Sequence, residues 1–241
     1  MDKARQEQQD YYADTAHDYD AMHGNEGGEH DFAFAVMRGL AERFGFKTIL
    51  DVGSGTGRIP LAFKQAGSSI ACTGVEPVSA LRDIGHAKGL SQSELRDGDA
   101  LALDFPDNSF DLVCAYAVLH HIKDHARAVS EMVRVARHGV FLSDANNFGQ
   151  GSAIARVVKQ AINAVGLWGA YDRIATRGKG YHYSQGDGVF YSYSVTTAVP
   201  VLRTKFPTLH AINTLPSAGL NLARQAPHIA LFATNLSLAD G

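Results

Sequence analysis

The stretch ILDVGSGTGRIP, residues 49–60, decides the expected fold. An apolar run leads into three glycines at every second position, Gly53, Gly55 and Gly57, and a helical pattern follows them. A glycine-rich turn between a strand and a helix lets the backbone approach a bound ligand closely. We therefore expect this stretch to form a strand, a ligand-binding turn and the start of a helix.

Short β-rich runs and helical patterns alternate along the chain around this turn. We expect strands at 48–52, 69–76, 93–99, 110–118, 140–145, 209–215 and 228–235. We expect helices at 31–45, 57–67, 77–89, 126–139, 151–166 and 197–206, and a hairpin or ordered loop at 179–194 that turns at the sequence GDG. Alternation of this kind predicts a parallel sheet with helices on both faces, which binds ligands beyond the carboxyl ends of its strands.

The composition is that of a globular protein, with 241 residues of which 45% are hydrophobic and 20% charged. The length favours one domain over residues 1–241. The net charge of −3 argues against a nucleic-acid partner. No run approaches the roughly 18 apolar residues of a membrane span, and the N-terminus lacks the apolar core of a signal peptide, so we expect no membrane partner.

Both cysteines, Cys72 and Cys114, lie in apolar runs. They are interpreted as buried free thiols in a reducing compartment, with the cytoplasm as the default location.

The spacing of the glycines distinguishes between classes of nucleotide-binding turn. The dinucleotide fingerprint G-x-G-x-x-G is not met, because Arg58 stands where its last glycine is required, and the Gly-Lys-Ser/Thr of a P-loop is absent. The observed spacing suits a ligand without a pyrophosphate, such as an adenosine with an amino-acid tail. Asp51 would then face the ammonium end of that tail.

Two further carboxylates follow the next two expected strands. Glu76 ends the second strand, where a carboxylate can accept hydrogen bonds from both ribose hydroxyls. Asp99 follows the third strand, where it can accept the adenine amino proton with the Ala100 backbone beside it. The ordered series of glycine turn, Glu and Asp is much more specific than the turn alone.

These residues resemble the motifs of the class I S-adenosylmethionine-dependent methyltransferases. LDVGSGTGR resembles the first motif, GVEPV the second and GDALALDFPDNSFDLV the third, and AVLHHI and EMVRVARHGVFLSDANN resemble the next part. The resemblance covers residues 10–145, and departs from the family only in having His138 and Gly139 where many members have Pro-Gly-Gly.

The resemblance implies a Rossmann-like three-layer sandwich with S-adenosyl-L-methionine as cofactor. Its seven-stranded, mostly parallel sheet would have the order 3-2-1-4-5-7-6, with strand 7 antiparallel. The residues expected at the cofactor are Tyr12, Tyr19, Asp51, Gly53, Ser54, Gly55, Gly57, Glu76, Pro77, Asp99, Ala100 and Ala115.

Two segments flank the part of the chain that carries the motifs. The resemblance implies that residues 1–31 form an N-terminal lid, in which Tyr12 and Tyr19 either close over the cofactor or anchor a helix. Residues 146–194 form an insert that we expect to contact substrate. The insert includes a basic run, residues 156–179, with five Lys and Arg and one Asp, which is either a solvated helix face or a site for an anionic substrate group.

The candidate catalytic residues follow the fourth and fifth strands. His120 and His121 follow the fourth, and Asp144 ends the fifth. One histidine, with Asp144 as its partner, is either a general base of near-normal pKa or part of the pocket wall. We expect no metal, because His121 and His125 lack a zinc-binding pattern.

The function that we expect is methyl transfer from S-adenosylmethionine to an O or N atom of a small molecule, such as a sugar, a natural-product intermediate or an acidic metabolite. A non-catalytic cofactor-binding module and a nucleotide-dependent oxidoreductase remain the alternatives. The sequence does not reveal the oligomeric state.

Overall fold

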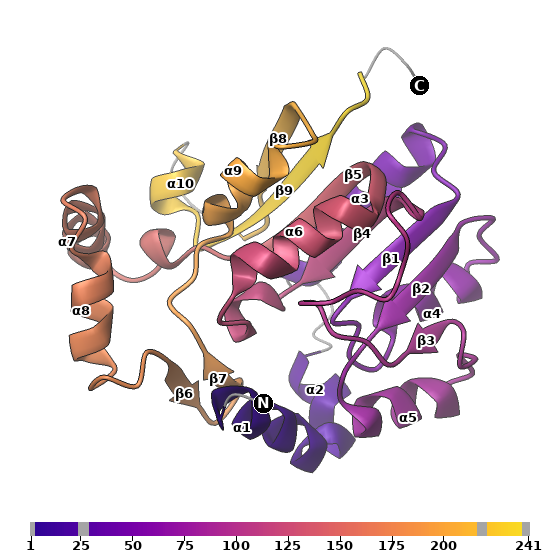
Figure 1. Ribbon diagram of the computed structural model, residues 1–241, viewed down its shortest axis with the longest axis horizontal. Helices are drawn as coiled ribbons and strands as arrows, with labels where there is room; N and C mark the ends of the chain where they lie inside the picture. The colour runs from indigo at the N-terminus through magenta and orange to yellow at the C-terminus, as the bar shows by residue number, and fades with distance from the viewer. Residues whose placement is uncertain (1–2, 24–28, 216–220, 238–241) are drawn as a thin grey trace.

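The computed structural model describes residues 3–23, 29–215 and 221–237, and centres on one seven-stranded sheet (Figure 1). The strands run in the order β3-β2-β1-β4-β5-β9-β8. Their bounds are β1 Thr48–Val52, β2 Ala71–Val75, β3 Leu95–Arg96, β4 Phe110–Tyr116, β5 Ala136–Ala145, β8 Thr208–Asn213 and β9 His228–Thr234. Strands β1 to β5 are mutually parallel, and β9 is antiparallel to both of its neighbours. The expected order and the antiparallel last strand are confirmed.

Helices cover both faces of this sheet (Figure 1). The bounds of these helices are α3 Glu29–Arg43, α4 Arg58–Gln65, α5 Ser79–Ala87, α6 His125–Val135 and α9 Val199–Leu202. Side chains of α3 and α4 share one hydrophobic core with the sheet, and side chains of α6 and α9 share the other. The expected three-layer sandwich is therefore confirmed.

The alternation of side chains along each strand supplies both cores. In β1, Ile49 packs into the core under α3 and α4, whereas Leu50 and Val52 pack into the core under α6. Strands β4 and β9 alternate in the same way. Each fully buried aliphatic side chain stabilises the fold by about 1.5–3 kcal/mol, so a strand that is apolar on both faces belongs at the centre of a sandwich.

The expected helix at 126–139 is wrong at its carboxyl end. α6 ends at Val135, and β5 begins at Ala136 with Gly139 inside the strand. A shift of register between β4 and β5 at Phe110 accommodates the extra strand residues. A Cβ at Gly139 would lie 2.9 Å from the carbonyl oxygen of Ala233, so the glycine permits close strand pairing. Pairing with β4 and β9 on both sides overrides the helical pattern of the sequence.

The expected insert folds into several short elements between β5 and β8. These are η3 Asn147–Gly149, α7 Ala153–Ala164, α8 Trp168–Ala175, β6 His182–Ser184 and β7 Gly188–Phe190, and η4 Val195–Ala198 follows the insert. The hairpin of β6 and β7 turns at the GDG sequence, as expected. Helix α8 was not predicted, and the expected helix at 197–206 is shorter than expected.

The N-terminal segment packs against this hairpin. It comprises α1 Lys3–Asp14, η1 Ala16–Asp18 and α2 Tyr19–His23, and residues 1–2 and 24–28 of the expected lid lie outside the described residues. The Tyr11 hydroxyl donates to the carbonyl oxygen of Gln185 at 2.8 Å, and the Gln8 side chain donates to the carbonyl oxygen of Asp187 at 3.1 Å. The acidic N-terminus is thus folded onto the domain over these residues.

Both cysteines are buried free thiols, as expected. Within residues 3–23, 29–215 and 221–237, none of the helices combines the length and the apolar composition that a membrane span requires.

Asn146 is fully buried at the start of the insert. Its Nδ2 donates to the carbonyl oxygens of Ala226 at 2.8 Å and Ala223 at 3.0 Å, beside the short helix α10 Leu222–Gln225. Its Oδ1 accepts a hydrogen bond from the Ser194 hydroxyl at 2.8 Å. Asn146 therefore connects three segments inside the fold.

We expect Asn146→Ala to lower the free energy of unfolding by about 1–3 kcal/mol, because it leaves buried donors and acceptors without partners. Urea-induced unfolding measures this loss. The control Asn163→Ala, on the exposed side of α7, should change the free energy of unfolding by less than about 0.5 kcal/mol. Equal stability of the two variants would contradict the structural role of Asn146.

Candidate active site

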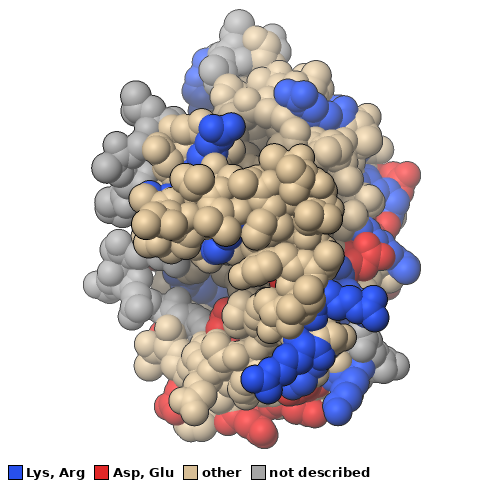
Figure 2. Space-filling model, turned by 90° about the vertical axis from the view of Figure 1, so that its left-hand side faces the viewer, with Lys and Arg blue, Asp and Glu red and all other residues tan. Residues whose placement is uncertain are grey.

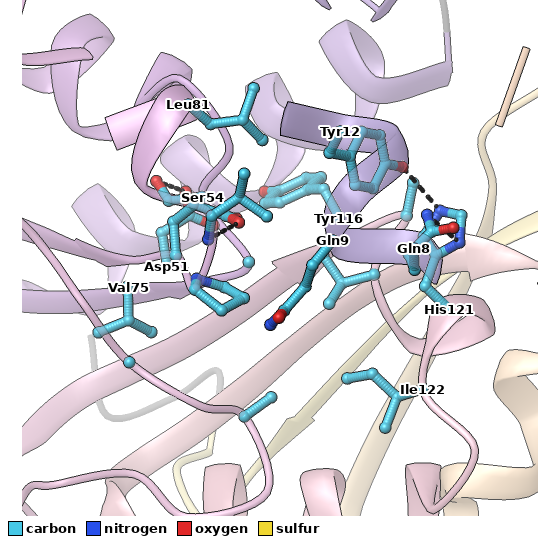
Figure 3. A pocket seen from close by; sticks show the side chains of 18 of the residues that line it. Gln8, Gln9, Tyr12, Asp51, Ser54, Val75, Leu81, Tyr116, His121 and Ile122 are labelled. Carbon is cyan, nitrogen blue, oxygen red and sulfur yellow. Dashed lines mark hydrogen bonds between the residues drawn. The ribbon is translucent and has the colours of Figure 1, made fainter. Parts of the chain in front are cut away.

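A cavity of about 490 Å³ lies where the carboxyl ends of β1, β2 and β4 meet, and side chains of α1 form part of its wall (Figure 3). This volume falls in the usual range for small-molecule sites. Most of the expected cofactor residues line it, namely Tyr12, Tyr19, Asp51, Gly53, Ser54, Glu76, Pro77, Asp99 and Ala100. Figure 3 shows Asp51 and Ser54 on one side of the cavity, and Tyr12 and His121 pointing toward each other on the opposite side.

The glycine-rich turn is held by the neighbouring strand β2. The backbone N–H groups of Gly53 and Ser54 both donate to the carbonyl oxygen of Val75, at 2.9 and 3.0 Å. Gly53 has a φ of +72°, and a Cβ there would lie 2.4 Å from a methyl group of Val118. The turn needs glycine at this position for its conformation and for its packing against the end of β4.

Three of the expected cofactor residues lie outside the cavity lining. Gly55 supports it from behind, because its N–H donates to Glu76 Oε2 at 3.1 Å. Gly57, with a φ of +77°, precedes α4, where a Cβ would lie 2.3 Å from Leu90. Ala115 is buried in β4 within the hydrophobic core.

Two carboxylates are buried at the cavity wall. Glu76 ends β2, and its Oε1 accepts the Val78 N–H at 2.9 Å. Burial raises the pKa of Glu76 to about 7 and the pKa of Asp51 to about 6. The Ser54 hydroxyl donates to Asp51 at 2.7 Å. Burial disfavours both charges, so a ligand that supplies hydrogen-bond donors or positive charge here would stabilise both groups.

Asp99 is held by the N-terminal helix. Its Oδ2 forms an ion pair with Arg5 of α1 at 2.9 Å, and its Oδ1 accepts the Leu101 N–H at 2.9 Å. Arg5 also lines the cavity. The carboxylate that we expected at the adenine is thus also a contact between α1 and the sheet.

Tyr12 of α1 and Tyr19 of α2 form an aromatic wall of the cavity. Their rings meet edge to face with centroids 5.7 Å apart. Burial raises the pKa of both phenols, so both hydroxyls stay neutral. The Tyr12 hydroxyl lies 3.0 Å from His121 Nε2, and the Tyr19 hydroxyl lies against the turn at Gly55.

His120 lies beside the expected partner Asp144 but outside the cavity lining. Its Nδ1 is 2.6 Å from Asp144 Oδ1, and its Nε2 is 3.3 Å from Asp187 Oδ2. Burial by itself would lower the pKa of His120, but the two carboxylates outweigh burial and raise it to about 10. A near-normal pKa is therefore wrong for His120, which is an imidazolium at neutral pH.

His121 is the histidine that lines the cavity. Burial, together with the charge of His120, lowers the pKa of His121, so this ring is neutral. Its Nδ1 lies 2.6 Å from the carbonyl oxygen of Val189, and only a protonated Nδ1 can donate there. Nε2 is therefore the acceptor atom, and the Tyr12 hydroxyl donates to it.

Asp144 is fully enclosed and holds the start of the segment that carries both histidines. Its Oδ2 accepts the Leu119 N–H at 2.9 Å, at the start of η2 Leu119–His121, and its Oδ1 accepts the Ala145 N–H at 2.6 Å. These bonds and His120 keep the pKa of Asp144 below its ordinary value despite burial.

Asp187 is the site residue that sequence reasoning missed. It lies in the turn between β6 and β7, lines the cavity and contacts both histidines. Burial would raise the pKa of Asp187, but its contacts with the two histidines, with the His120 imidazolium first, lower it far below its ordinary value. The only signal was the GDG turn, which predicted a hairpin and not an acid at the histidines.

Comparisons with known proteins place this geometry in a family. Residues 50–143 match the family model described as a methyltransferase domain. The phosphatidylethanolamine N-methyltransferase of Cereibacter sphaeroides is 34% identical over 47% of this chain and 57% of its own length. The demethylmenaquinone methyltransferase of Staphylococcus aureus strain MRSA252 is 36% identical over 43% of this chain and 44% of its own length. The chain thus spans about half the length of these curated relatives.

The fold is also that of a solved structure described as an S-adenosylmethionine-dependent methyltransferase, possible histamine N-methyltransferase, from Thermotoga maritima. The TM-score is 0.60 at 15% identity, over 94% of this chain and 99% of that chain. The sheet order and the cavity at the glycine-rich turn agree with the methyltransferase domain that residues 50–143 match. Residues 50–143 therefore carry a methyltransferase domain, and the chain has the fold of the class I S-adenosylmethionine-dependent methyltransferases, whose cofactor is S-adenosylmethionine.

Proposed function

We propose that this protein transfers a methyl group from S-adenosylmethionine to an oxygen or nitrogen atom of a small molecule. The observation that carries the proposal is the pair of buried carboxylates, Asp51 and Glu76, beside a glycine-rich turn in a cavity of about 490 Å³. Asp51 would hold the ammonium end of the cofactor and Glu76 its ribose hydroxyls. Asp99 and Ala100 would hold the adenine.

The chemistry requires little more than alignment and the exclusion of water. When bound, the cofactor supplies a methyl group that its sulfonium sulfur already activates. The chain must orient an acceptor atom toward that methyl group and keep water away. The wall formed by Tyr12, His121 and Asp187 supplies polar groups for this purpose at the end of the cavity away from Asp51.

Two segments support a small substrate. The N-terminal helix and the turn between β6 and β7 both contribute side chains to the cavity wall, which favours a small substrate over an extended polymer. We propose that residues 1–31 act as a lid and that residues 146–194 contact substrate. The related enzymes are named for phosphatidylethanolamine and demethylmenaquinone, and both names support a small acceptor, although they do not identify the acceptor of this chain.

A non-catalytic cofactor-binding module is the main alternative. It would keep Asp51 and Glu76 and would not need the polar wall at His121. Incubation of the protein with S-adenosylmethionine and a panel of hydroxyl and amine acceptors separates the two. Formation of S-adenosylhomocysteine with an acceptor supports the enzyme, whereas cofactor binding without turnover supports the module. Binding of NADH in place of S-adenosylmethionine would support the oxidoreductase.

We expect Glu76→Ala to weaken S-adenosylmethionine binding by about 1–3 kcal/mol, roughly 5- to 150-fold, because it removes a charged hydrogen-bond acceptor from the site. Isothermal titration calorimetry measures this change. The matched control is Glu94→Ala, which removes a carboxylate paired with Lys64 outside the cavity lining, and it should leave affinity unchanged. Equal affinities of the Glu76 and Glu94 variants would contradict the assignment.

We expect His121→Ala to lower turnover roughly 100- to 10,000-fold, the range for loss of a group that handles the acceptor's proton. Cofactor affinity should change little. The control His17→Ala alters a histidine on the outer surface and should keep full turnover. Production of S-adenosylhomocysteine with a responsive acceptor measures both, and full turnover by the His121 variant would show that this side chain is only part of the wall.

A further inference from the structure

Three side chains from two distant segments converge at the end of the cavity. His120 and His121 follow β4, and Asp187 reaches them from the β6–β7 turn. The Nε2 atoms of the two histidines lie 3.3 and 3.4 Å from the Asp187 carboxylate oxygens. One atom from each of the three residues lies within 4.8 Å of the others.

These distances match a shared metal ion better than direct pairing. A charge-assisted hydrogen bond between nitrogen and a carboxylate is about 2.7–2.9 Å long. Two ligand atoms that each lie about 2.0–2.1 Å from a tetrahedral metal ion are about 3.3–3.4 Å apart. Both distances from the histidines to Asp187 fall in the second range.

The outer nitrogens of both rings are already fixed. His120 Nδ1 contacts the Asp144 carboxylate at 2.6 Å, and His121 Nδ1 contacts the Val189 carbonyl oxygen at 2.6 Å. Metal-binding histidines almost always donate their second N–H to a carboxylate or a backbone carbonyl in this way. Both Nε2 atoms lie beside the Asp187 carboxylate, and the metal ion would take the place of the Tyr12 hydroxyl at His121 Nε2.

We propose that His120, His121 and Asp187 bind one divalent first-row transition-metal ion at the acceptor end of the cavity. Two imidazoles and one carboxylate are a common ligand set for Zn²⁺ and Fe²⁺ at sites with an open coordination position. Without metal, the His120 imidazolium is the one positive charge beside two carboxylates, Asp144 and Asp187. A divalent ion would balance both carboxylates while the rings of His120 and His121 are neutral.

The open coordination position of the ion would bind the methyl acceptor, an inference that rests on the proposed function. The ion would bind the acceptor's oxygen or nitrogen and lower its pKa, so that its proton leaves to solvent. The acceptor's lone pair then forms the bond to the methyl carbon, and the electrons of the carbon–sulfur bond return to sulfur. The expectation of no metal considered His121 with His125, whereas the converging partners are His120 and Asp187.

Metal titration of the chelator-treated full chain tests this site without cofactor or acceptor. We expect calorimetry with Zn²⁺ to show one ion per chain, and Co²⁺ to give visible absorption bands of a coordinated ion. Asp187→Asn should weaken binding by at least a hundredfold. Asp144→Asn, which changes the group that supports His120 and the start of η2 without removing a metal ligand, should weaken it by about 10- to 100-fold.

The control is His182→Ala, which removes a histidine from a histidine–aspartate pair with Asp172 at 3.2 Å and no third ligand. This variant should bind metal as the wild type does. Thermal unfolding checks that the Asp187 and Asp144 variants are folded. Absence of stoichiometric binding by the wild type, or equal binding by folded Asp187→Asn protein, would overturn the proposal. Because the assay contains no cofactor, its result is separate from that of the methyl-transfer assay.

A different observation concerns α7, whose apolar side faces outward. Ile154 is 78% exposed and Val157 67%, and one turn further on Ala161 is exposed as well. The polar side faces the protein instead: Lys159 donates to the Asn147 carbonyl oxygen at 3.0 Å. A solvated helix would have the opposite orientation.

Helix α8 and the loop before it extend this apolar surface. The exposed side chains of the α7–α8 face are Ile154, Val157, Val158, Val165, Leu167, Tyr171 and Ile174. Figure 2 shows a broad area without charge on this side of the molecule, with basic side chains around it and acidic ones at the lower and right-hand edges. Figure 1 shows that α7 and α8 stand out from the rest of the fold. Contiguous exposed apolar surface of this kind marks an interaction site.

The charges around the α7–α8 face favour an anionic partner. Arg173, Arg177 and Lys179 are exposed, and Asp172, the acid in this segment, is paired with His182. Two copies of the chain docked by this face would place these basic groups near each other in a symmetric contact. A protruding apolar surface with a basic border fits the headgroup region of an anionic bilayer.

We propose that the α7–α8 face docks on an anionic lipid bilayer. Docking at the surface does not require a membrane-spanning helix, so the proposal departs from the expectation of no membrane partner, which considered only spanning segments. The β6–β7 hairpin directly follows α8 and contributes Asp187 to the cavity, so a docked α7–α8 face would lie close in sequence to the cavity wall.

Vesicle flotation tests the docking. We expect the protein to float with phosphatidylcholine vesicles that contain about one-third phosphatidylglycerol, and much less with phosphatidylcholine alone. Ile154→Asp combined with Ile174→Asp should lower the bound fraction at least tenfold. Arg173→Gln should lower it by roughly fivefold, the effect of one basic residue near an anionic surface.

The control is Phe32→Asp on α3, which charges a side chain that is 50% exposed elsewhere, and it should bind vesicles like the wild type. Absence of vesicle binding, or unchanged binding by the Ile154 and Ile174 variant, would overturn the proposal. Analytical ultracentrifugation adds a further check. A dimer that the same variant dissociates, without vesicle binding, would assign the α7–α8 face to a second copy of the chain and would also overturn it.

Discussion

The attachment of the glycine-rich turn to β2 is the constraint on which the rest of the site depends. One carbonyl group, that of Val75, accepts the N–H groups of both Gly53 and Ser54. The next residue, Glu76, accepts the N–H groups of Gly55 and Val78 with its carboxylate. The turn is therefore bonded to β2 at two residues, through the Val75 carbonyl group and through the carboxylate of Glu76 at the end of the strand. The backbone path after β1 and the position of the buried carboxylate cannot vary independently.

The other side of the cavity depends on a contact between the two segments that flank the family motifs. Gln8 of α1 is buried, its amide group donates to the Asp187 carbonyl oxygen, and its carbonyl oxygen accepts the Val189 N–H. One side chain thus satisfies two backbone groups of the hairpin and fixes α1 beside it. Because buried backbone groups need partners, moving α1 away would expose the hairpin and open the cavity together.

The charges around the histidines are balanced by neighbouring charged side chains, and not by solvent. Asp144 and Asp187 lie on opposite sides of His120, and burial alone would make every one of these charges unfavourable. The imidazolium between the carboxylates offsets that cost, whereas neutral His121 faces the cavity. Two adjacent residues of the same type thus have different protonation states because only one lies between two acids.

Much of the sheet and half of the site could be predicted from the sequence alone. Strand β1, the turn after it and Glu76 are local patterns, in which each residue's role depends on its place at the end of a strand. The boundary between α6 and β5 could not be predicted, because it depends on pairing with β4 and β9.

Asp187 belongs to the part that only the tertiary structure decided. It meets His120 and His121 through a hairpin more than sixty residues further along the chain, so no spacing in the sequence connects them. The raised pKa of His120 follows from that contact and was missed with it. The outward orientation of α7 also depends on tertiary contacts. The sequence pattern of α7 is amphipathic, but it does not show which side of the helix faces the protein. The hydrogen bonds of Lys159 to Asn147 determine which side is exposed. A sequence shows which groups a segment carries, but the free energy of a buried charge or an exposed apolar face depends on neighbours that only folding brings together.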